Sequence, residues 1–172
     1  MHAPAAARLL AFLTAVAPAA TLAGPCPWLS AETAAQVILA RPAEATVEKN
    51  PVFANARAMT ASTTCRFKAA GELVGQLAVV VMEFASYEAA TAAYRGELKS
   101  QGSRAKPAKI GASPAFFTHN PGFSAASYAV KDKRLVFVNH AFSKGVKEAM
   151  AKDPDGAVLS THEVARQVLG RL

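Results

Sequence analysis

The sequence is poor in cysteine and has no close grouping of metal-binding residues. Cys26 and Cys65 are its only cysteines in 172 residues, so neither a CxxC pair nor a CxxCH haem-attachment motif occurs. Structural zinc sites and thiol redox sites depend on such close spacing. No hydrophobic run reaches the roughly 20 residues that a membrane-spanning helix needs. The sequence therefore predicts a mature chain without a metal centre, a cofactor or a transmembrane segment.

Motifs that mark common enzyme active sites are also missing. There is no GxSxG nucleophile motif and no glycine-rich loop of the kind that binds nucleotide phosphates. Paired carboxylates are scarce, because Asp132, Asp153 and Asp155 stand in turn-forming sequences, where aspartate is favoured for backbone reasons. These absences favour a protein that is not an enzyme, without deciding the question.

What the sequence does contain begins with an export signal. Arg8 precedes the apolar segment Leu9–Leu22, and Thr21-Leu22-Ala23 supplies small residues at the two positions that a signal peptidase reads. We expect cleavage near Ala23, which removes residues 1–23 as a signal peptide. Residues 24–172 then form a single domain in the periplasm or outside the cell.

Export brings Cys26 and Cys65 into an oxidising compartment, where disulfides form and persist. We therefore predict a disulfide between them. A metal-binding pair and a redox-active thiol are the alternatives, and neither has the spacing that such sites use. Lipidation of Cys26 would leave Cys65 unpaired, and Pro25 stands where the cleavage before a lipidated cysteine would have to occur.

Hydrophobic periodicity predicts helices and hairpins after the signal. Helices are expected at 31–40, at 87–101, near 146–151 and from Ser160, where Ser160-Thr161-His162-Glu163 has the form of a capping box. Strands are expected around 46–49 and at 63–69, 73–83, 115–119, 123–131 and 134–142, with 103–109 as a basic linker. The class is α+β: one antiparallel sheet of about five strands with N-terminal, middle and C-terminal helices packed on it.

Histidine and phenylalanine recur at alternate positions of the last strands. If Lys131 opposes Arg134 and His119 opposes Phe123, these rings share one face of the sheet. The candidate ligand face consists of Phe117, His119, Phe123, His140 and Phe142. His119 and His140 would then lie diagonally two strands apart, on the order of 10 Å between backbones, which is wide for one zinc ion. The face could bind a flat apolar ligand or simply be covered by a helix.

Basic residues outnumber acidic ones, 19 to 12, for a formal charge of +7. A candidate patch for an anionic partner consists of Arg104, Lys106, Lys109, Lys131, Lys133 and Arg134. Such a patch could dock on anionic lipid head groups or on an acidic envelope protein. A solvated loop surface accounts for it equally well. Nucleic acid is not expected as a partner, because no aromatic residue interleaves these cations.

Several short motifs in this order carry a resemblance to a known group. They are Cys26-Pro27-Trp28-Leu29-Ser30-Ala31-Glu32 before the first helix, Cys65-Arg66-Phe67 at a strand, Ile110-Gly111 before Ala115-Phe116-Phe117, and an alanine-, valine- and leucine-rich final helix. In these features the chain resembles a loose group of small exported bacterial envelope proteins with a PsbP-like fold. The resemblance implies a binding or accessory role in the envelope, and it carries over no catalytic residue.

Together these observations predict an exported accessory or binding domain that is not catalytic, with a protein, a lipid or a small apolar molecule as its ligand. The alternative is a small envelope hydrolase or metal-dependent enzyme that uses His119 or His140. The two differ in whether those histidines converge with a carboxylate or an oxyanion pocket in the folded chain.

Overall fold

The computed structural model describes residues 26–40, 42–50, 58–71, 75–150, 152–153 and 155–172. The predicted signal peptide, its cleavage near Ala23, and Pro25 lie outside the described residues. Within the described part, no helix is both long and apolar enough to cross a membrane.

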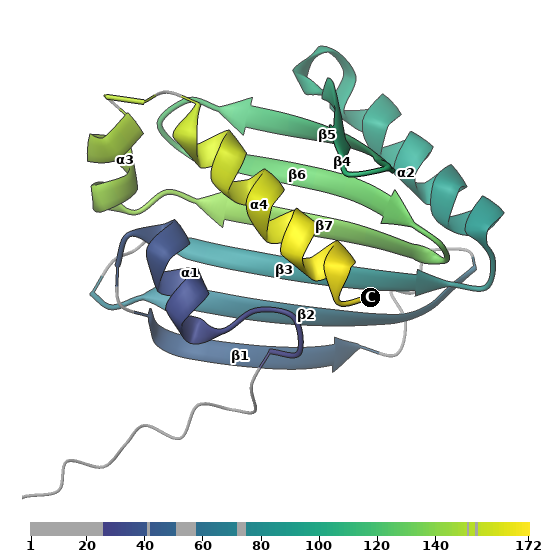
Figure 1. Ribbon diagram of the computed structural model, residues 1–172, viewed down its shortest axis with the longest axis horizontal. Coiled ribbons are helices and arrows are strands. Elements are labelled where there is room, and N and C mark those ends of the chain that lie inside the picture. Colours follow the sequence, from purple (N-terminus) through teal and green to yellow (C-terminus); the bar gives the residue numbers. More distant parts are fainter. Residues whose placement is uncertain (1–25, 41, 51–57, 72–74, 151, 154) are drawn as a thin grey trace, which may run out of the picture.

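One antiparallel sheet organises the molecule (Figure 1). Its order is β1-β2-β3-β7-β6-β5-β4. The strands are β1 Pro42–Asn50, β2 Met59–Ala69, β3 Gln76–Phe84, β4 Lys106–Ile110, β5 Ser113–Asn120, β6 Ser124–Lys131 and β7 Arg134–Ala141. The sequence predicted the α+β class and the antiparallel pairing, but the sheet has seven strands rather than about five. The difference lies at the two edges of the sheet, where β4 was not expected as a strand and β1 was expected only around residues 46–49.

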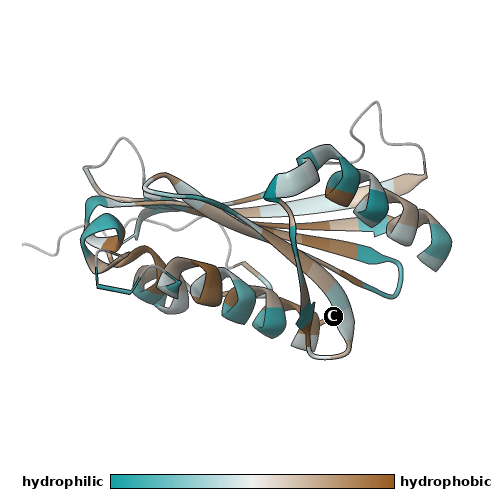
Figure 2. Cartoon of the chain, turned by 90° about the horizontal axis from the view of Figure 1, so that it is seen from above, coloured by the Kyte–Doolittle hydropathy of each residue, from teal (hydrophilic) through white to brown (hydrophobic). Residues whose placement is uncertain are grey.

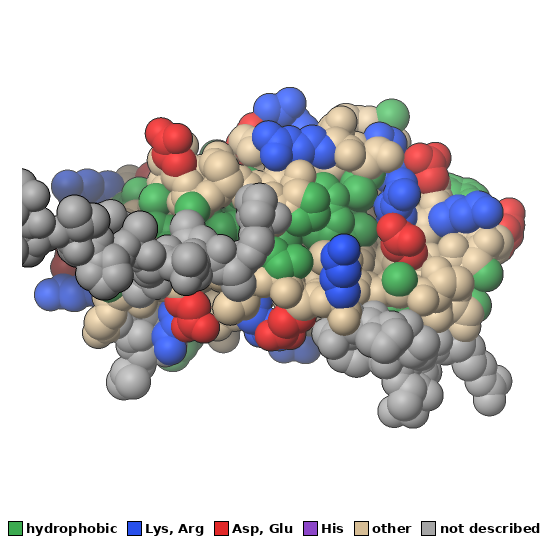
Figure 3. All heavy atoms as spheres, turned by 90° about the horizontal axis from the view of Figure 1, so that it is seen from below, with side chains coloured by type: hydrophobic (Ala, Val, Ile, Leu, Met, Phe, Trp, Pro, Cys, Tyr) green, Lys and Arg blue, Asp and Glu red, His purple; other side chains and the backbone are tan. Residues whose placement is uncertain are grey.

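The edge strands explain that difference. β4 occupies the segment expected to be a linker, because Pro107 and the flanking lysines Lys106 and Lys109 make it look irregular in sequence. Proline and lysine are the residues that protect an exposed sheet edge from pairing with another chain. β1 forms the opposite edge and is longer than the short strand expected there. Figure 3, seen from the β1 side, shows hydrophobic side chains surrounded by charged ones.

Helices cover both faces of the sheet (Figures 1 and 2). The described α-helices are α1 Ala31–Ile38, α2 Tyr87–Gln101, α3 Lys144–Met150 and α4 Gly156–Gly170, with a 3-10 turn at Gly102–Arg104. We call the face under α1, α3 and α4 the front face, and the face under α2 the back face. Helix α2 has the predicted bounds, with the Ser86 hydroxyl accepting from the Ala89 N–H.

The back face is held by a row of aromatic rings. Phe116 lies opposite Tyr128, and Tyr128 lies opposite Phe137, in adjacent strands. The ring centroids are 4.4 Å and 4.6 Å apart, and Tyr94 of α2 packs on Phe116 at 5.4 Å. Burial raises the pKa of Tyr128 to about 12. Such cross-strand pairs stabilise a sheet beyond the area that they bury.

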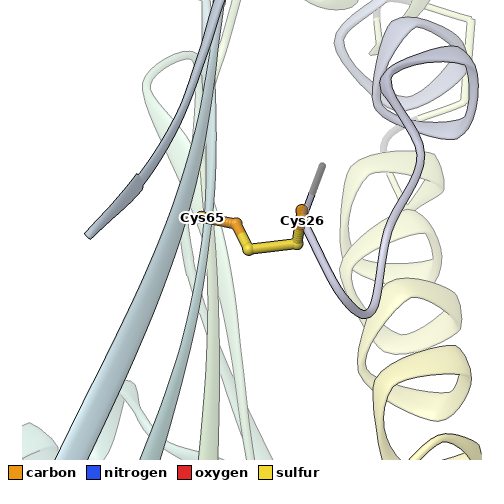
Figure 4. The surroundings of a disulfide bond; sticks show 2 residues. All are labelled: Cys26 and Cys65. Atoms are coloured by element: carbon orange, nitrogen blue, oxygen red, sulfur yellow. A yellow bond between two sulfur atoms is a disulfide. The ribbon is translucent and has the colours of Figure 1, made fainter. Parts of the chain in front are cut away.

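The front face carries the larger core and the disulfide. Cys26 and Cys65 are bonded, as predicted, with their Cα atoms 5.7 Å apart. The bond ties the segment before α1 to the middle of β2 (Figure 4). Cys65 itself is completely buried among the strand residues that α1 and α4 cover. The disulfide therefore fixes α1 against the sheet.

Helix α4 is anchored to the front face along its length. The buried hydroxyls of Ser127 and Thr161 lie 2.8 Å apart. Near the other end of the helix, the Lys131 ammonium donates to the Leu169 carbonyl at 2.7 Å, and Arg134 donates to the Leu172 carbonyl at 3.2 Å. Cations at a helix C-terminus are favoured by the helix dipole and by the free carbonyls there.

The start of α4 differs from the expectation. The helix begins at Gly156, four residues before the predicted capping box. Ser160 lies inside the helix, where its hydroxyl donates to the Gly156 carbonyl at 2.8 Å. The turn-like run Asp153 to Gly156 concealed this start. A Cβ at position 156 would lie 2.9 Å from a carboxylate oxygen of Asp153, so glycine leaves room for that carboxylate.

Candidate functional site

The front face holds the histidines that the sequence singled out, but in a different register. Ala125 lies opposite His140 as predicted, whereas His119 also lies opposite Ala125 rather than opposite Phe123. The β5–β6 connection has three residues, as expected, but it spans residues 121–123 rather than 120–122, so the partner of His119 differs by two positions. His119 and His140 are therefore aligned across β6 rather than diagonal.

The predicted ligand face is brought together only in part. Phe117, His119, His140 and Phe142 lie on the front face, where the His140 and Phe142 rings meet edge to face at 5.3 Å. Phe117 contacts His162 of α4 at 5.4 Å, also edge to face. Phe123 is elsewhere: it stands in the β5–β6 connection, 67% exposed, with the Lys147 ammonium 5.9 Å from its ring centre. Helix α4 covers β6 and β7, and α1 covers β1, β2 and β3.

A half-open cavity of about 150 Å³ lies between α1, α3 and α4, and His140 is among its lining residues. We call it the His140 cavity. Its other lining residues come from α1, α3 and the start of α4: Gln36, Val37, Leu39, Val146, Ala149, Met150, Asp153, Gly156, Ala157 and Ser160. The walls are mainly aliphatic, with polar groups at separate points. Sites for small molecules commonly combine such walls with a few placed polar groups.

His140 is the unusual member of this lining. It has no exposed surface, and among the described residues neither of its ring nitrogens has a hydrogen-bond partner. Burial lowers the pKa of His140 to about 4, so the ring is neutral at pH 7. A neutral imidazole offers one N–H donor and one acceptor. Leaving a buried polar group unpaired costs about 1–3 kcal/mol, so this pair of nitrogens requires an explanation.

The walls of the cavity are held in place by a buried serine. The Ser143 hydroxyl donates to the Ile38 carbonyl at the end of α1, at 2.7 Å. The same oxygen accepts from the Val146 N–H at the start of α3, at 3.1 Å. One side chain thus joins the two helices that form opposite walls of the cavity. The relative position of α1 and α3 at the cavity therefore depends on Ser143.

Leu39 at the edge of the cavity has a strained backbone. Its φ of 49° is in the left-handed region, where a residue with a Cβ is disfavoured by roughly 1–2 kcal/mol. The side chain is 52% exposed, so burial does not offset the strain. Local strain of this kind concentrates at binding sites. Glycine is the usual residue at such a helix end.

The other histidines do not build a metal site. Nε2 of His119 and Nε2 of His162 are buried and have no hydrogen-bond partner in the described part of the chain. Burial lowers the pKa of His162. Among the residues that the structure describes, no group of three histidine, cysteine, aspartate or glutamate side chains could hold a metal ion.

The candidate basic patch is divided by the fold. Lys131 donates to the Leu169 carbonyl of α4, and Arg134 donates to the Leu172 carbonyl beyond the helix and pairs with Glu83. Lys106 and Lys109 are exposed on the edge strand β4, and Arg104 is exposed just before it. Lys133 is exposed in the β6–β7 turn. Four of the six cations are thus exposed, whereas Lys131 and Arg134 are engaged near the end of α4.

A second hollow, of about 570 Å³, lies on the back face between α2 and strands β2 and β3. Its walls include Met59, Met82 and Phe84, and on α2 the small residues Ala93 and Gly96. Glu97 is the charged residue of its lining. Neither hollow has a signal in the sequence, because the walls of each come from several separate segments. The His140 cavity is the better candidate because it is the more enclosed of the two hollows.

Comparison with known proteins gives no family for this chain. It matches no family model and no curated protein. It is similar to the crystal structure of the extracellular domain of PknH from Mycobacterium tuberculosis, with 11% identity, coverage of 80% of this chain and 93% of that one, and a TM-score of 0.47. It is also similar to a GTP binding regulator from Thermotoga maritima, with 16% identity, 81% and 92% coverage, and a TM-score of 0.39. With these identities and TM-scores, neither similarity shows a family or a function for this chain.

Proposed function

We propose that this protein is an exported, disulfide-bonded domain that binds a small molecule in the His140 cavity and does not catalyse a reaction. The observation that carries the proposal is the cavity itself, whose mainly aliphatic walls come from α1, α3 and α4 and carry polar side chains at separate points. Sites for small molecules commonly have this composition.

Two observations support export. The apolar segment Leu9–Leu22 after Arg8 has the composition of a signal peptide. The Cys26–Cys65 bond is of the kind that persists in oxidising compartments and is rare in the cytosol.

The chemistry of His140 favours binding over catalysis. A general base works best when its pKa lies near the operating pH, whereas burial holds the pKa of His140 at about 4. A catalytic imidazole is also normally oriented by a partner such as a carboxylate. His140 has no such partner in the described part of the chain. An enzyme built on His119 or His140 is therefore the weaker hypothesis.

The test is native mass spectrometry of the protein purified without denaturation, compared with two cavity-filling variants. Ala157→Leu places a larger side chain in the His140 cavity, and Ala93→Leu does the same in the hollow on the back face. We expect a small molecule to co-purify with the native protein and with Ala93→Leu, but not with Ala157→Leu. Xenon binding, followed by NMR, reports the same cavity when no molecule co-purifies. Loss of binding in Ala93→Leu alone would contradict the proposal.

A further inference from the structure

Buried, unpaired nitrogens are concentrated on the front face. In the described part of the chain, six side-chain polar atoms are buried without a hydrogen-bond partner, and four of them are ring nitrogens of His119, His140 and His162. His119 and His140 project from β5 and β7, and His162 reaches this face from α4, where it contacts Phe117. A positive charge on one of these rings would be buried without a partner, which is costly.

The two halves of α4 pack in different hydrophobic clusters. The second half belongs to the large front core with Cys65, through Val164, Ala165, Val168 and Leu169. The start of α4 and α3 instead share a small separate cluster, formed by Ala125, Phe142, Val146, Ala157 and Val158. Figure 1 shows α3 and the start of α4 together at one end of the sheet. We call residues 144–150 and 156–162 the α3–α4 segment.

This segment can move without the rest of α4. The contacts of Lys131 with the Leu169 carbonyl and of Arg134 with the Leu172 carbonyl lie at the other end of the helix. Within the segment, the Thr161 hydroxyl lies 2.8 Å from that of Ser127 on β6. Proteins open locally in units that have a small apolar core of their own. The small cluster makes the α3–α4 segment such a unit.

Both His140 and His162 are enclosed by the α3–α4 segment. His140 lines the cavity whose walls include α3 and the start of α4, and its ring meets Phe142 of the small cluster at 5.3 Å. His162 belongs to the segment itself, and its ring lies edge to face against Phe117 at 5.4 Å. Opening of the segment would bring both rings into water, where each can accept a proton at no burial cost.

The charged groups near the two rings do not offset their burial. Asp153 is the charged residue of the cavity lining, and it is exposed, so water screens its carboxylate. The strands beside β7 place Leu77 and Ala125 opposite His140, and α1 contributes only uncharged residues to the cavity. Strand β5, which faces His162, has His119 as its titratable residue. The remaining charges of α3 and α4 are exposed: Lys144, Lys147, Glu148, Glu163 and Arg166.

We propose that the α3–α4 segment is an acid-sensitive switch, in which protonation of His140 and His162 opens the segment while the rest of the domain stays folded. The charged rings then face water instead of Phe117 and Phe142. Because α3 and the start of α4 are walls of the His140 cavity, the open form lacks that cavity. The switch needs no ligand, so it stands or falls independently of the proposed function.

The test is hydrogen–deuterium exchange of the purified, disulfide-bonded protein at pH 7 and pH 5, with rates corrected for the pH dependence of exchange in unstructured peptides. In the open form the pKa of His140 returns to about 6.5, whereas burial holds it at about 4 in the closed form. His140 alone should therefore make opening of the segment about twentyfold more frequent at pH 5 than at pH 7. Peptides from β2, β3 and α2 should keep their protection.

Three variants assign the effect. His140→Gln and His162→Gln keep a polar side chain that does not titrate in this range, so each should reduce the acid response and the double variant should remove most of it. Val146→Ala is the matched control, because Val146 is buried in the small cluster and does not titrate. It should increase opening by the same factor at both pH values and leave the ratio between them unchanged.

The outcomes decide the proposal in each case. Equal protection of the α3–α4 segment at pH 7 and pH 5 would overturn it. So would a loss of protection in every segment together, since acid would then unfold the domain as a whole. An undiminished acid response in the double variant would assign the effect to other groups. If His140→Gln does not fold, His162→Gln and the ring ¹⁵N titration of the native protein replace it. A His140 ring that stays neutral until the whole domain unfolds would also overturn the proposal.

Discussion

His119 and His140 lie opposite the same residue, Ala125, on either side of β6. Both side chains therefore project from the front face at the same height along the strands, two strand spacings apart, which is roughly 10 Å. Phe142 contacts both rings, with centroid distances of 6.2 Å to His119 and 5.3 Å to His140. The histidines are thus set in aromatic surroundings rather than beside carboxylates, and this makes the domain sensitive to acid.

Acid should destabilise the fold through His140. Burial lowers its pKa from 6.5 to about 4, so the unfolded chain takes up a proton first as the pH falls. The contribution of His140 to the free energy of unfolding is therefore fully present above about pH 6.5. It falls by about 3 kcal/mol as the pH is lowered to about 4. Burial also lowers the pKa of His162, which adds a loss of the same sign.

Urea unfolding across this pH range measures the effect. His140→Gln has no group that titrates there, so its free energy of unfolding should change less with pH than that of the native protein. Equal pH dependence in the two proteins would show that His140 does not carry the effect.

The disulfide should contribute a large part of the stability. Cys26 and Cys65 are 39 residues apart in sequence, and closing a loop of that length in the unfolded chain is worth about 4 kcal/mol in the entropic model. Replacing both cysteines by serine should lower the free energy of unfolding by about 2–5 kcal/mol. Reductant should destabilise the native protein and leave the double variant unchanged. A reductant effect on the double variant would point to a different target.

Lys131 should stabilise the domain through α4 rather than through an anionic partner. Its ammonium donates to the Leu169 carbonyl, so Lys131→Met should cost about 1 kcal/mol in unfolding experiments. Lys133→Met is the matched control, because Lys133 is exposed in the adjacent turn. If the two substitutions cost the same, the contact with α4 contributes nothing measurable.

The sequence correctly predicted those helices and strands whose local residue pattern agrees with their place in the folded domain. Helix α2 has a serine cap and a regular apolar stripe, and the Lys131–Arg134 hairpin has a two-residue turn, so both were placed correctly. The disulfide could be predicted because the sequence has two cysteines and an expected export signal, which brings them into an oxidising compartment. Four of the five residues of the candidate ligand face lie on one face of the sheet, since residue alternation fixes which face a side chain occupies but not where the next loop begins. That loop put Phe123 outside the face.

The cavity itself could not be predicted, because its walls come from parts of the chain that are far apart in sequence. Gln36 and Val37 on α1 meet Val146 on α3 only after both helices dock on the sheet. The start of α4 was also hidden, since Gly156 reads as a turn residue until the neighbouring Asp153 carboxylate is placed beside it. The strain at Leu39 is likewise a property of the folded backbone and leaves no sequence signal beyond the absence of glycine at the helix end.

Leu39 should lower the stability of the domain and strengthen binding in the His140 cavity. Leu39→Gly relieves the left-handed strain at the end of α1 and should raise the free energy of unfolding by about 1 kcal/mol. It also removes a side chain that lines the His140 cavity, so xenon should bind more weakly. Asp132→Gly is the control, because Asp132 has a φ of 50° in the β6–β7 turn and does not line the cavity. It should stabilise the protein without changing the affinity for xenon. If Leu39→Gly stabilises the fold and binds xenon as tightly as the native protein, the strain at this position has no role in binding, and the leucine side chain does not contribute to the wall of the site.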